Sequence, residues 1–200
     1  RKKGLIVTLF SNGTLLTKEK ALMLSEWNLD QIEISIYGGT KETYEKVTRV
    51  PGSYDRCMAG IKNALDAGLR LNLKTIVLKE NLHELDLMRS ITEEFGLKFR
   101  YDGTVWPRLD GSLEPLRHQI PSETLLNLDF TDEKRKSAWN KTQDLAGNSI
   151  LRDERVFACN ASVRSFHIDA FGYLNACMMT RSINYNVLEL GFNKAWEEIG

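Results

Sequence analysis

The sequence carries no net charge and no long apolar segment, and these two absences exclude several classes of protein. Lysine and arginine number 27, aspartate and glutamate also number 27, and the formal net charge at pH 7 is zero. Balanced charge gives no support for binding nucleic acid or an anionic membrane through bulk electrostatics. No apolar run approaches the roughly 20 residues of a transmembrane helix, and the basic start is not followed by a secretory signal. We therefore expect a cytoplasmic protein without nucleic-acid or membrane partners.

The common nucleotide-binding and hydrolase motifs are also missing. Glycines occur as Asn12-Gly13 and Gly38-Gly39, without the Gly-x-Gly-x-x-Gly or Gly-Lys-Ser/Thr patterns of phosphate-binding loops. There is no Gly-x-Ser-x-Gly elbow for a nucleophilic serine, and the three histidines lack the paired spacing of a zinc site. The sequence thus does not support nucleotide-phosphate binding, serine hydrolysis or a zinc site.

The chain does have enough apolar residues for a folded core. Its 200 residues are 42% hydrophobic, which suits one compact domain, or a large domain with a smaller appendage. The chain begins without methionine and ends directly on a tryptophan-containing segment without a terminal tail. We expect it to be a fragment of a longer protein.

Strand and helix patterns alternate through residue 106. Such alternation is typical of parallel strands joined by right-handed crossovers. Four strands are too few for a closed barrel but suit part of one. The predicted strands are residues 4–10, 31–39, 71–78 and 97–106, and the predicted helix starts are capped by Thr17, Thr40, Ser53 and a capping box from Asn81 to Glu84.

Residues 31–39 are the best-organised stretch. Isoleucines alternate with Glu33, Ser35 and Tyr37, which places the polar side chains on one face of a strand. The following Gly38-Gly39 allows close backbone approach to a ligand or a sharp turn. This pattern indicates a ligand site, although an ordinary strand-to-helix junction fits it equally well. Arg49 has the planar fork that binds a carboxylate, and a surface arginine is an equal alternative.

The second half of the chain is less regular. Residues 108–121 contain an Asp-Gly pair and two prolines and predict a linker or lid. Two polar helices follow, and then a β-hairpin turning at residues 170–172. The expected organisation is a partial barrel over residues 1–107, a linker with helices over 108–150, and a small α+β segment over 151–200.

The three cysteines differ in context. Cys57 falls on the apolar face of a predicted helix, where it acts as a small hydrophobic residue. Cys159 precedes the predicted hairpin and Cys177 ends it. These two are compatible with buried thiols, a disulfide or half of a metal site, although a cytoplasmic location counts against the disulfide.

Several segments together resemble the radical S-adenosylmethionine (radical SAM) enzymes that carry a C-terminal SPASM domain. They occur in the order and spacing of that family and cover most of the chain. The spacing of Cys159, Gly172 and Cys177 is similar to the opening of the SPASM auxiliary-cluster motif. Twelve residues separate Cys159 from Gly172, and four separate Gly172 from Cys177. The barrel segments that carry the resemblance are residues 10–16, 34–38, 49–54 and 75–81.

The resemblance implies strands three to six of a (β/α)6 barrel followed by the start of a SPASM domain. Cys159 and Cys177 would then ligate an auxiliary [4Fe–4S] cluster. This chain lacks the Cys-x-x-x-Cys-x-x-Cys that binds the catalytic cluster in the family. It also lacks the Gly-Gly-Glu-Pro of the second strand and the later SPASM cysteines. We therefore expect the fragment alone to be inactive.

The activity implied by the resemblance is that of an oxidoreductase. A reduced [4Fe–4S] cluster cleaves S-adenosylmethionine (AdoMet), and the resulting radical abstracts hydrogen from a substrate. Asn12 and Ser35 would contact the ribose or amino-acid part of AdoMet, and Arg49 its carboxylate. Tyr37 stands where relatives often carry aspartate, which leaves its role open.

The substrate and partners are also implied only by resemblance. Residues 106–112 resemble a bridge found in peptide-maturing members, which favours a peptide or protein substrate modified by a maturase. An electron donor such as flavodoxin or ferredoxin would be the second partner. The alternatives are a sulfatase-maturing type of enzyme and a non-catalytic peptide-binding module on a degenerate barrel.

Overall fold

The computed structural model describes residues 4–27, 29–146 and 161–199. These residues form two compact units, one of residues 1–107 with 113–125 and one of residues 108–112 with 126–200. Each unit is considered by itself below.

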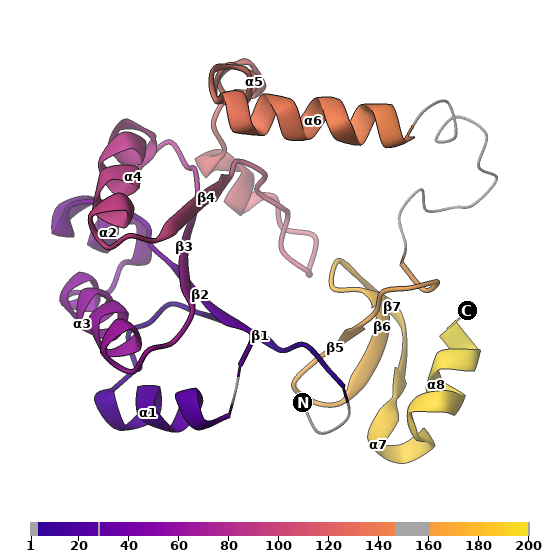
Figure 1. The fold of residues 1–200 in the computed structure, drawn as a ribbon. Coiled ribbons are helices and arrows are strands. Elements are labelled where there is room, and N and C mark those ends of the chain that lie inside the picture. Colours follow the sequence, from indigo (N-terminus) through magenta and orange to yellow (C-terminus); the bar gives the residue numbers. More distant parts are fainter. Residues whose placement is uncertain (1–3, 28, 147–160, 200) are drawn as a thin grey trace. The chain divides into compact units, whose positions relative to one another are not determined.

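The first unit is built on a four-stranded parallel sheet (Figure 1) with the strand order β1-β2-β3-β4. This confirms the predicted α/β fold of a partial barrel. Its strands are β1 (Thr8–Ser11), β2 (Gln31–Ser35), β3 (Leu71–Ile76) and β4 (Lys98–Asp102). Its helices are α1 (Lys18–Glu26), α2 (Lys41–Thr48), α3 (Ser53–Asp66), the 3-10 turn η1 (Leu82–Glu84), α4 (Leu85–Glu94) and the 3-10 turn η2 (Glu114–His118).

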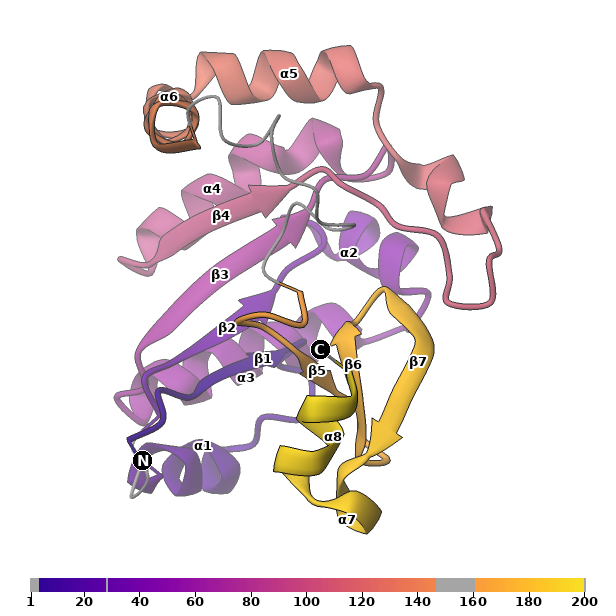
Figure 2. The ribbon, with the colours of Figure 1, turned by 90° about the vertical axis from the view of Figure 1, so that its right-hand side faces the viewer.

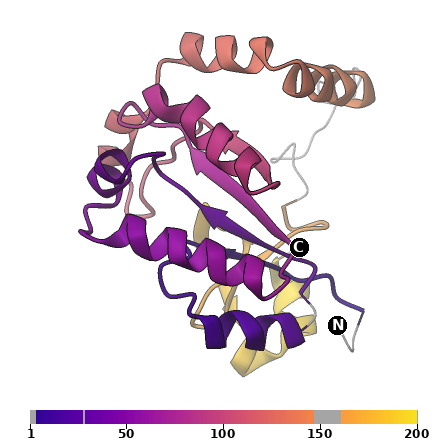
Figure 3. The ribbon, with the colours of Figure 1, turned by 60° about the vertical axis from the view of Figure 1, so that its left-hand side comes forward.

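The two faces of this sheet differ in character. Helices α1, α3 and α4 lie along one side of the strands (Figures 1 and 3). The strand residues on that side form the apolar core, because burying their side chains removes apolar area from water. Ile32, Ile34, Leu71 and Leu73 are each at most 4% exposed. Strand alternation puts Glu33, Ser35 and Lys74 on the opposite side.

The observed strands are shorter than predicted. β1 begins at Thr8 rather than residue 4, because Thr8 is the first residue that pairs with β2, opposite Gln31. β4 ends at Asp102, opposite Ile76 at the end of β3. The extent of the neighbouring strand therefore sets these ends.

Two of the three single-residue helix caps are confirmed. The hydroxyl oxygens of Thr17 and Thr40 accept hydrogen bonds from the third residue along, at 3.3 Å in both cases. The predicted cap at Ser53 is wrong. Gly52 occupies that position with φ at 73°, and Ser53 is already helical. The left-handed conformation of Gly52 turns the chain into α3, where a residue with a Cβ would be strained.

The predicted capping box from Asn81 to Glu84 is also wrong. The side chain of Asn81 makes no capping bond to its own helix, and the chain enters α4 through the turn η1. Its Oδ1 instead accepts a hydrogen bond from the Leu78 N–H at 2.8 Å. The carboxylate of Glu84 instead accepts hydrogen bonds from the hydroxyls of Thr40 and Thr43 at the start of a different helix, α2.

The second unit contains helices on both sides, in sequence, of a small antiparallel sheet (Figure 2). Helix α5 (Ser122–Thr131) begins in the first unit and leads to α6 (Glu133–Ala146). The predicted hairpin is confirmed, and Gly172 in its turn has φ at 87°. A third strand and two helices after the hairpin were not predicted. The elements after α6 are β5 (His167–Ile168), β6 (Tyr173–Cys177), β7 (Thr180–Asn186), α7 (Val187–Leu190) and α8 (Phe192–Ile199).

An aromatic cluster ties α8 to the segment before β5. The ring centroid of Phe166 lies 5.1 Å from that of Phe192 and 5.6 Å from that of Trp196. Aromatic pairs at such separations stabilise packing beyond the area they bury.

Among the helices of the described residues, none is long and apolar enough to cross a membrane.

Helix α3 packs closely against the turn after β1 at Gly60. A Cβ at Gly60 would overlap the carbonyl oxygen of Gly13. Gly60→Ala is therefore expected to lower the free energy of unfolding by about 1–3 kcal/mol, although alanine favours a helix. Urea denaturation measures the change. The control Ala59→Gly, on the exposed side of α3, should cost no more than the helix propensity of about 1 kcal/mol. A Gly60→Ala protein as stable as the wild type would contradict the close approach.

Candidate functional site

The carboxyl ends of β1 and β2 open into a pocket. Parallel strands end at the same edge of a sheet, which is where α/β folds place ligands. The cavity has a volume of about 440 Å3 and takes its walls from the loops after β1 and β2, from α2 and from the start of α3. Its lining residues are Asn12, Thr14, Tyr37, Tyr44, Val47, Thr48, Val50, Ser53 and Arg56.

Aromatic and polar side chains share the pocket wall. The rings of Tyr37 and Tyr44 meet edge to face with centroids 5.9 Å apart, and the hydroxyls of Thr48 and Ser53 lie 2.8 Å apart. Arg56 is the one charged side chain among the lining residues. The pocket therefore combines a positive charge with rings and hydroxyl groups, which suits a ligand with an anionic group and an apolar part.

Tyr44 has a hydroxyl group without a partner. The residue is 1% exposed, and its hydroxyl has no hydrogen-bond partner among the described residues. Burial raises its pKa, with the neighbouring Cys57 as a second cause. Burial also raises the pKa of the Cys57 thiol to about 11. Both groups are protonated at neutral pH, and the Tyr44 O–H is buried beside the Cys57 thiol at the wall of the pocket.

The three residues predicted to bind AdoMet are in different surroundings. Asn12 lines the pocket, and its Oδ1 accepts hydrogen bonds from the N–H and the hydroxyl of Thr14 at 3.1 and 2.9 Å. Ser35 ends β2 and Arg49 follows α2 with φ at 57°, and both are outside the pocket lining. Their binding roles remain predictions.

Arg56 is a pocket residue that the sequence reasoning missed. It lies in the first turn of α3, where its N–H donates to the Gly52 carbonyl oxygen at 3.3 Å. The available signal was an arginine four residues after the glycine of the Pro51-Gly52 turn. Arg49 is closer to this turn in the sequence, but the bend at Gly52 brings Arg56 to the pocket.

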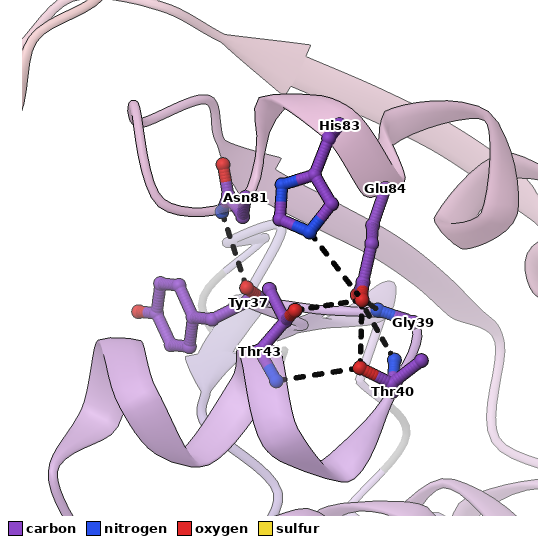
Figure 4. A network of polar contacts seen from close by, with 7 residues as sticks. All are labelled: Tyr37, Gly39, Thr40, Thr43, Asn81, His83 and Glu84. Atoms are coloured by element: carbon purple, nitrogen blue, oxygen red, sulfur yellow. Dashed lines mark hydrogen bonds and ion pairs between the residues drawn. The ribbon is translucent and has the colours of Figure 1, made fainter.

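The loop between β2 and α2 is held by one carboxylate from η1, the turn before α4 in the same unit (Figure 4). Glu84 accepts hydrogen bonds from the N–H groups of Gly39 and Thr40 at 2.8 and 3.0 Å. It also accepts from the hydroxyls of Thr40 and Thr43, both at 2.6 Å. Burial disfavours ionisation of Glu84, but the hydrogen bonds from Thr40, Thr43 and Gly39 outweigh it and lower its pKa. A carboxylate at the start of α2 also complements the helix dipole.

Asn81 ties the same loop to the end of β3. Its Nδ2 donates to the carbonyl oxygens of Tyr37 and Ile76 at 3.2 and 3.1 Å. The residue is fully buried. Glu84 and Asn81 thus fix the backbone on both sides of Gly38, between the two tyrosines of the pocket wall.

The Gly38-Gly39 pair serves close packing in this structure. A Cβ at Gly38 would lie 2.5 Å from the N atom of Tyr44, and one at Gly39 would lie 2.5 Å from Cγ of Leu87. Such distances are too short for any side chain. The glycines therefore allow α2 and α4 to approach the loop, as a sharp turn requires.

Cys177 lies at the end of β6, beyond an irregularity in its pairing with β7. The N–H of Met179 donates to its sulfur at 3.5 Å. Backbone N–H groups directed at cysteine sulfur are one way in which proteins tune iron–sulfur centres. Cys159 lies outside the described residues, and within those residues no three potential metal ligands cluster together. The chemistry of the Cys177 sulfur fits a cluster ligand, and this role remains a prediction.

Comparison with known proteins identifies the family. The sequence model of the Radical SAM superfamily matches residues 1–91, which contain β1 to β3 and every residue of the pocket lining. Residues 1–91 belong to the radical SAM superfamily. This confirms the resemblance in the barrel segments, and members of the superfamily use a [4Fe–4S] cluster and AdoMet.

The chain is similar to enzymes with different named activities. It is 34% identical over 93 residues to AdoMet-dependent heme synthase of Methanosarcina barkeri, covering 46% of this chain and 27% of that protein. It is 33% identical over 85 residues to PqqA peptide cyclase of Rhizobium meliloti, covering 42% and 23%. The chain thus spans about a quarter of the length of these curated relatives.

Solved structures show the same fold at low sequence identity. Native anSMEcpe with bound AdoMet matches 98% of this chain with a TM-score of 0.66 and 13% identity, and the chain covers 58% of it. The form with bound AdoMet and Cp18Cys peptide gives a TM-score of 0.58 and 15% identity, covering 98% and 61%. The fold of the chain is therefore like that of anSMEcpe.

The Glu84 network predicts a loss of stability when its charge is removed. Glu84→Gln should lower the free energy of unfolding at pH 7 by about 1–3 kcal/mol, because the amide keeps only one acceptor oxygen and its NH2 cannot accept the two hydrogen bonds that the other carboxylate oxygen receives. Urea denaturation measures the change. Glu93→Gln, an exposed substitution on α4, is the matched control and should leave the midpoint unchanged.

The same network predicts a pH dependence. The pKa of Glu84 in the folded state is below its ordinary value of 4.5, so the contribution is complete above that pH and is lost as the pH falls through the folded pKa. The stability difference between the wild type and Glu84→Gln should therefore shrink below pH 4.5. A difference that is constant down to the acid transition would show that the carboxylate charge is not involved.

Proposed function

We propose that the chain is part of a radical SAM/SPASM oxidoreductase that abstracts hydrogen from a peptide or protein substrate. The observation that carries the proposal is the pocket at the carboxyl ends of β1 and β2, which lies within the superfamily region and combines Arg56 with the unpartnered Tyr44 hydroxyl. AdoMet presents a carboxylate, an amine, ribose hydroxyls and an aromatic base. These groups match the donors, acceptors and rings of the pocket.

The residues of this chain would bind and orient AdoMet. In the pocket, Arg56 would hold the carboxylate through a charge-assisted hydrogen bond, and Asn12 and Tyr44 would bond its polar groups. Ser35 and Arg49 are proposed as further contacts from the strand end and the α2 terminus. The catalytic [4Fe–4S] cluster supplies the electron that cleaves AdoMet, and the protein sets the orientation of the reacting groups.

The second unit is proposed to begin a SPASM domain. Cys159 and Cys177 would contribute to an auxiliary [4Fe–4S] cluster, and the Met179 N–H already directed at the Cys177 sulfur supports that role. A cysteine thiolate is the ordinary protein ligand of such clusters.

A peptide or protein is the proposed substrate. Two similar proteins support this choice by name, the PqqA peptide cyclase and anSMEcpe bound to the Cp18Cys peptide. A ribosomal-peptide maturase is favoured over a sulfatase-maturing type by the segment at residues 106–112. The proposal includes a cytoplasmic location and an electron donor such as flavodoxin or ferredoxin.

The central test is anaerobic reconstitution of the full-length protein with iron and sulfide, followed by assay for 5′-deoxyadenosine. Reductant-dependent formation of 5′-deoxyadenosine is expected. A protein that binds AdoMet or peptide but forms no cluster and cleaves no AdoMet would instead be the non-catalytic binding module.

Paired arginine variants test which side chain binds the AdoMet carboxylate. Arg56→Gln is expected to weaken AdoMet binding roughly 10- to 100-fold, the loss of about 1.5–3 kcal/mol that a charge-assisted hydrogen bond contributes. Equilibrium dialysis with AdoMet measures the affinity. Arg49→Gln is the matched comparison. A larger loss in Arg49→Gln than in Arg56→Gln would transfer the role to Arg49.

Cysteine variants test the auxiliary cluster. Cys177→Ala in the reconstituted full-length protein should lower the iron and sulfide content by part of one cluster, while the AdoMet-cleaving cluster remains. Iron and sulfide analysis with the visible absorbance measures this change. Cys57→Ala is the matched control, because Cys57 is 1% exposed within the core, and its iron content should equal that of the wild type. Unchanged iron in Cys177→Ala would rule out ligation by this residue.

A further inference from the structure

The face of the first sheet away from α1, α3 and α4 carries a charged cluster. We call it the polar face. By strand register, Glu33 lies opposite Phe10 on β1, and Ser35, Lys74 and Arg100 lie side by side in one row across β2, β3 and β4. None of these residues lines the pocket described above. The cluster is therefore a separate feature of the first unit.

Glu33 is the centre of this cluster. It is 7% exposed, and its Oε2 accepts hydrogen bonds from Nε and Nη2 of Arg100 at 3.2 and 2.8 Å. Its Oε1 accepts from Nε2 of Gln31 at 3.3 Å. A buried carboxylate is costly unless it is paired and hydrogen-bonded. Both oxygens of Glu33 are thus already engaged.

Lys74 is left incompletely satisfied by this arrangement. Its Nζ is 3.6 Å from the Glu33 Oε2, longer than a good hydrogen bond, and 3.7 Å from the centroid of the Phe10 ring. No other side-chain or backbone acceptor is described for it. Burial lowers the pKa of Lys74, and the Arg100 charge lowers it further against the opposing effect of Glu33. An ammonium group in this position gains from an additional anion.

The charges on the polar face do not balance. The register adds Lys98 and Asp102 to this face, so three cationic side chains stand against Glu33 and Asp102. Asp102 bonds the Thr104 N–H at 2.9 Å. Arg100 is 53% exposed and reaches Glu33 with Nε and Nη2. Lys74 and Arg100 therefore both lie beside Glu33, and each keeps N–H donors that Glu33 does not use.

We propose that Lys74 and Arg100 form a binding site for a carboxylate group of the substrate. A guanidinium fork beside an ammonium is a suitable pair of donors for a planar carboxylate, and Glu33 holds the Arg100 side chain in place. The substrate class is thus a molecule with an acidic group, such as a peptide with an acidic side chain or a free carboxyl terminus. Assignment of the carboxylate to the substrate rests on the proposed function, whereas the anion site does not.

AdoMet also has a carboxylate, so the test must separate the two sources. The full-length protein is treated with a limiting amount of an acetylating N-hydroxysuccinimide ester, and modification of Lys74 is measured by peptide mass spectrometry. Disodium succinate is the probe, succinamide is its neutral match, and AdoMet is the third ligand. Lys41, whose Nζ pairs with Asp55 at 2.5 Å, is the internal reference.

Succinate is expected to slow acetylation of Lys74 in a saturable way, by about threefold when its concentration is twice its dissociation constant. Lys41 should be unaffected, and neither succinamide nor AdoMet should protect Lys74. Arg100→Gln should abolish the protection. Arg70→Gln, which removes an exposed arginine 3.7 Å from Asp30, is the matched control and should retain it.

Any of four results would overturn the proposal. Equal protection by succinamide, or none by succinate, would exclude an anion site. Protection that persists in Arg100→Gln would exclude the arginine. Protection by AdoMet as strong as that by succinate would assign the carboxylate to AdoMet rather than to the substrate. The assay needs neither a cluster nor turnover, so its failure is distinct from a failure to form 5′-deoxyadenosine.

Discussion

The carboxylate of Glu84 links two adjacent segments of the first unit, and the geometry of the candidate site depends on it. It accepts hydrogen bonds from the N–H groups of Gly39 and Thr40 and from the hydroxyls of Thr40 and Thr43, where the loop after β2 enters α2. Its own backbone belongs to the turn η1 before α4. The loop carries Tyr37 on one side and Tyr44 on the other. Four hydrogen bonds to one charged group therefore hold both aromatic walls of the pocket, at a place where the chain has no regular backbone pairing.

The two faces of the first sheet have different roles, one in packing the core and one in carrying charged side chains. One face packs branched apolar side chains such as Ile34 and Leu73 against the helices, and these side chains are fully buried. The other face places Glu33, Lys74 and Arg100 within reach of one another. Because side chains alternate along a strand, substitutions on the polar face can change ligand binding without removing apolar core area.

The two functional proposals use different positive charges. Arg56 stands in the pocket at the strand ends and is assigned to AdoMet, while Lys74 and Arg100 stand on the polar face and are assigned to the substrate. A radical SAM enzyme must hold both molecules close together for hydrogen transfer. Two separate cationic sites would let each molecule be oriented independently, and the first site lies within the residues that match the superfamily model.

Local sequence patterns were sufficient for features that depend on neighbouring residues. The parallel strand and helix order, the caps at Thr17 and Thr40 and the hairpin turn at Gly172 are all confirmed. Each of them follows from side-chain periodicity or from a capping or turn residue that acts within a few positions. The family was also evident from short motifs in order.

Tertiary structure decided the features that join distant residues. Glu84 was expected to cap its own helix, but Thr40 and Thr43 lie more than forty positions away in the sequence and offer it four donors together with Gly39. Arg56 reaches the pocket because Gly52 bends the chain. A carboxylate or guanidinium takes the partners that the fold brings within hydrogen-bonding distance, and the sequence alone determines which groups are present but not which of them meet.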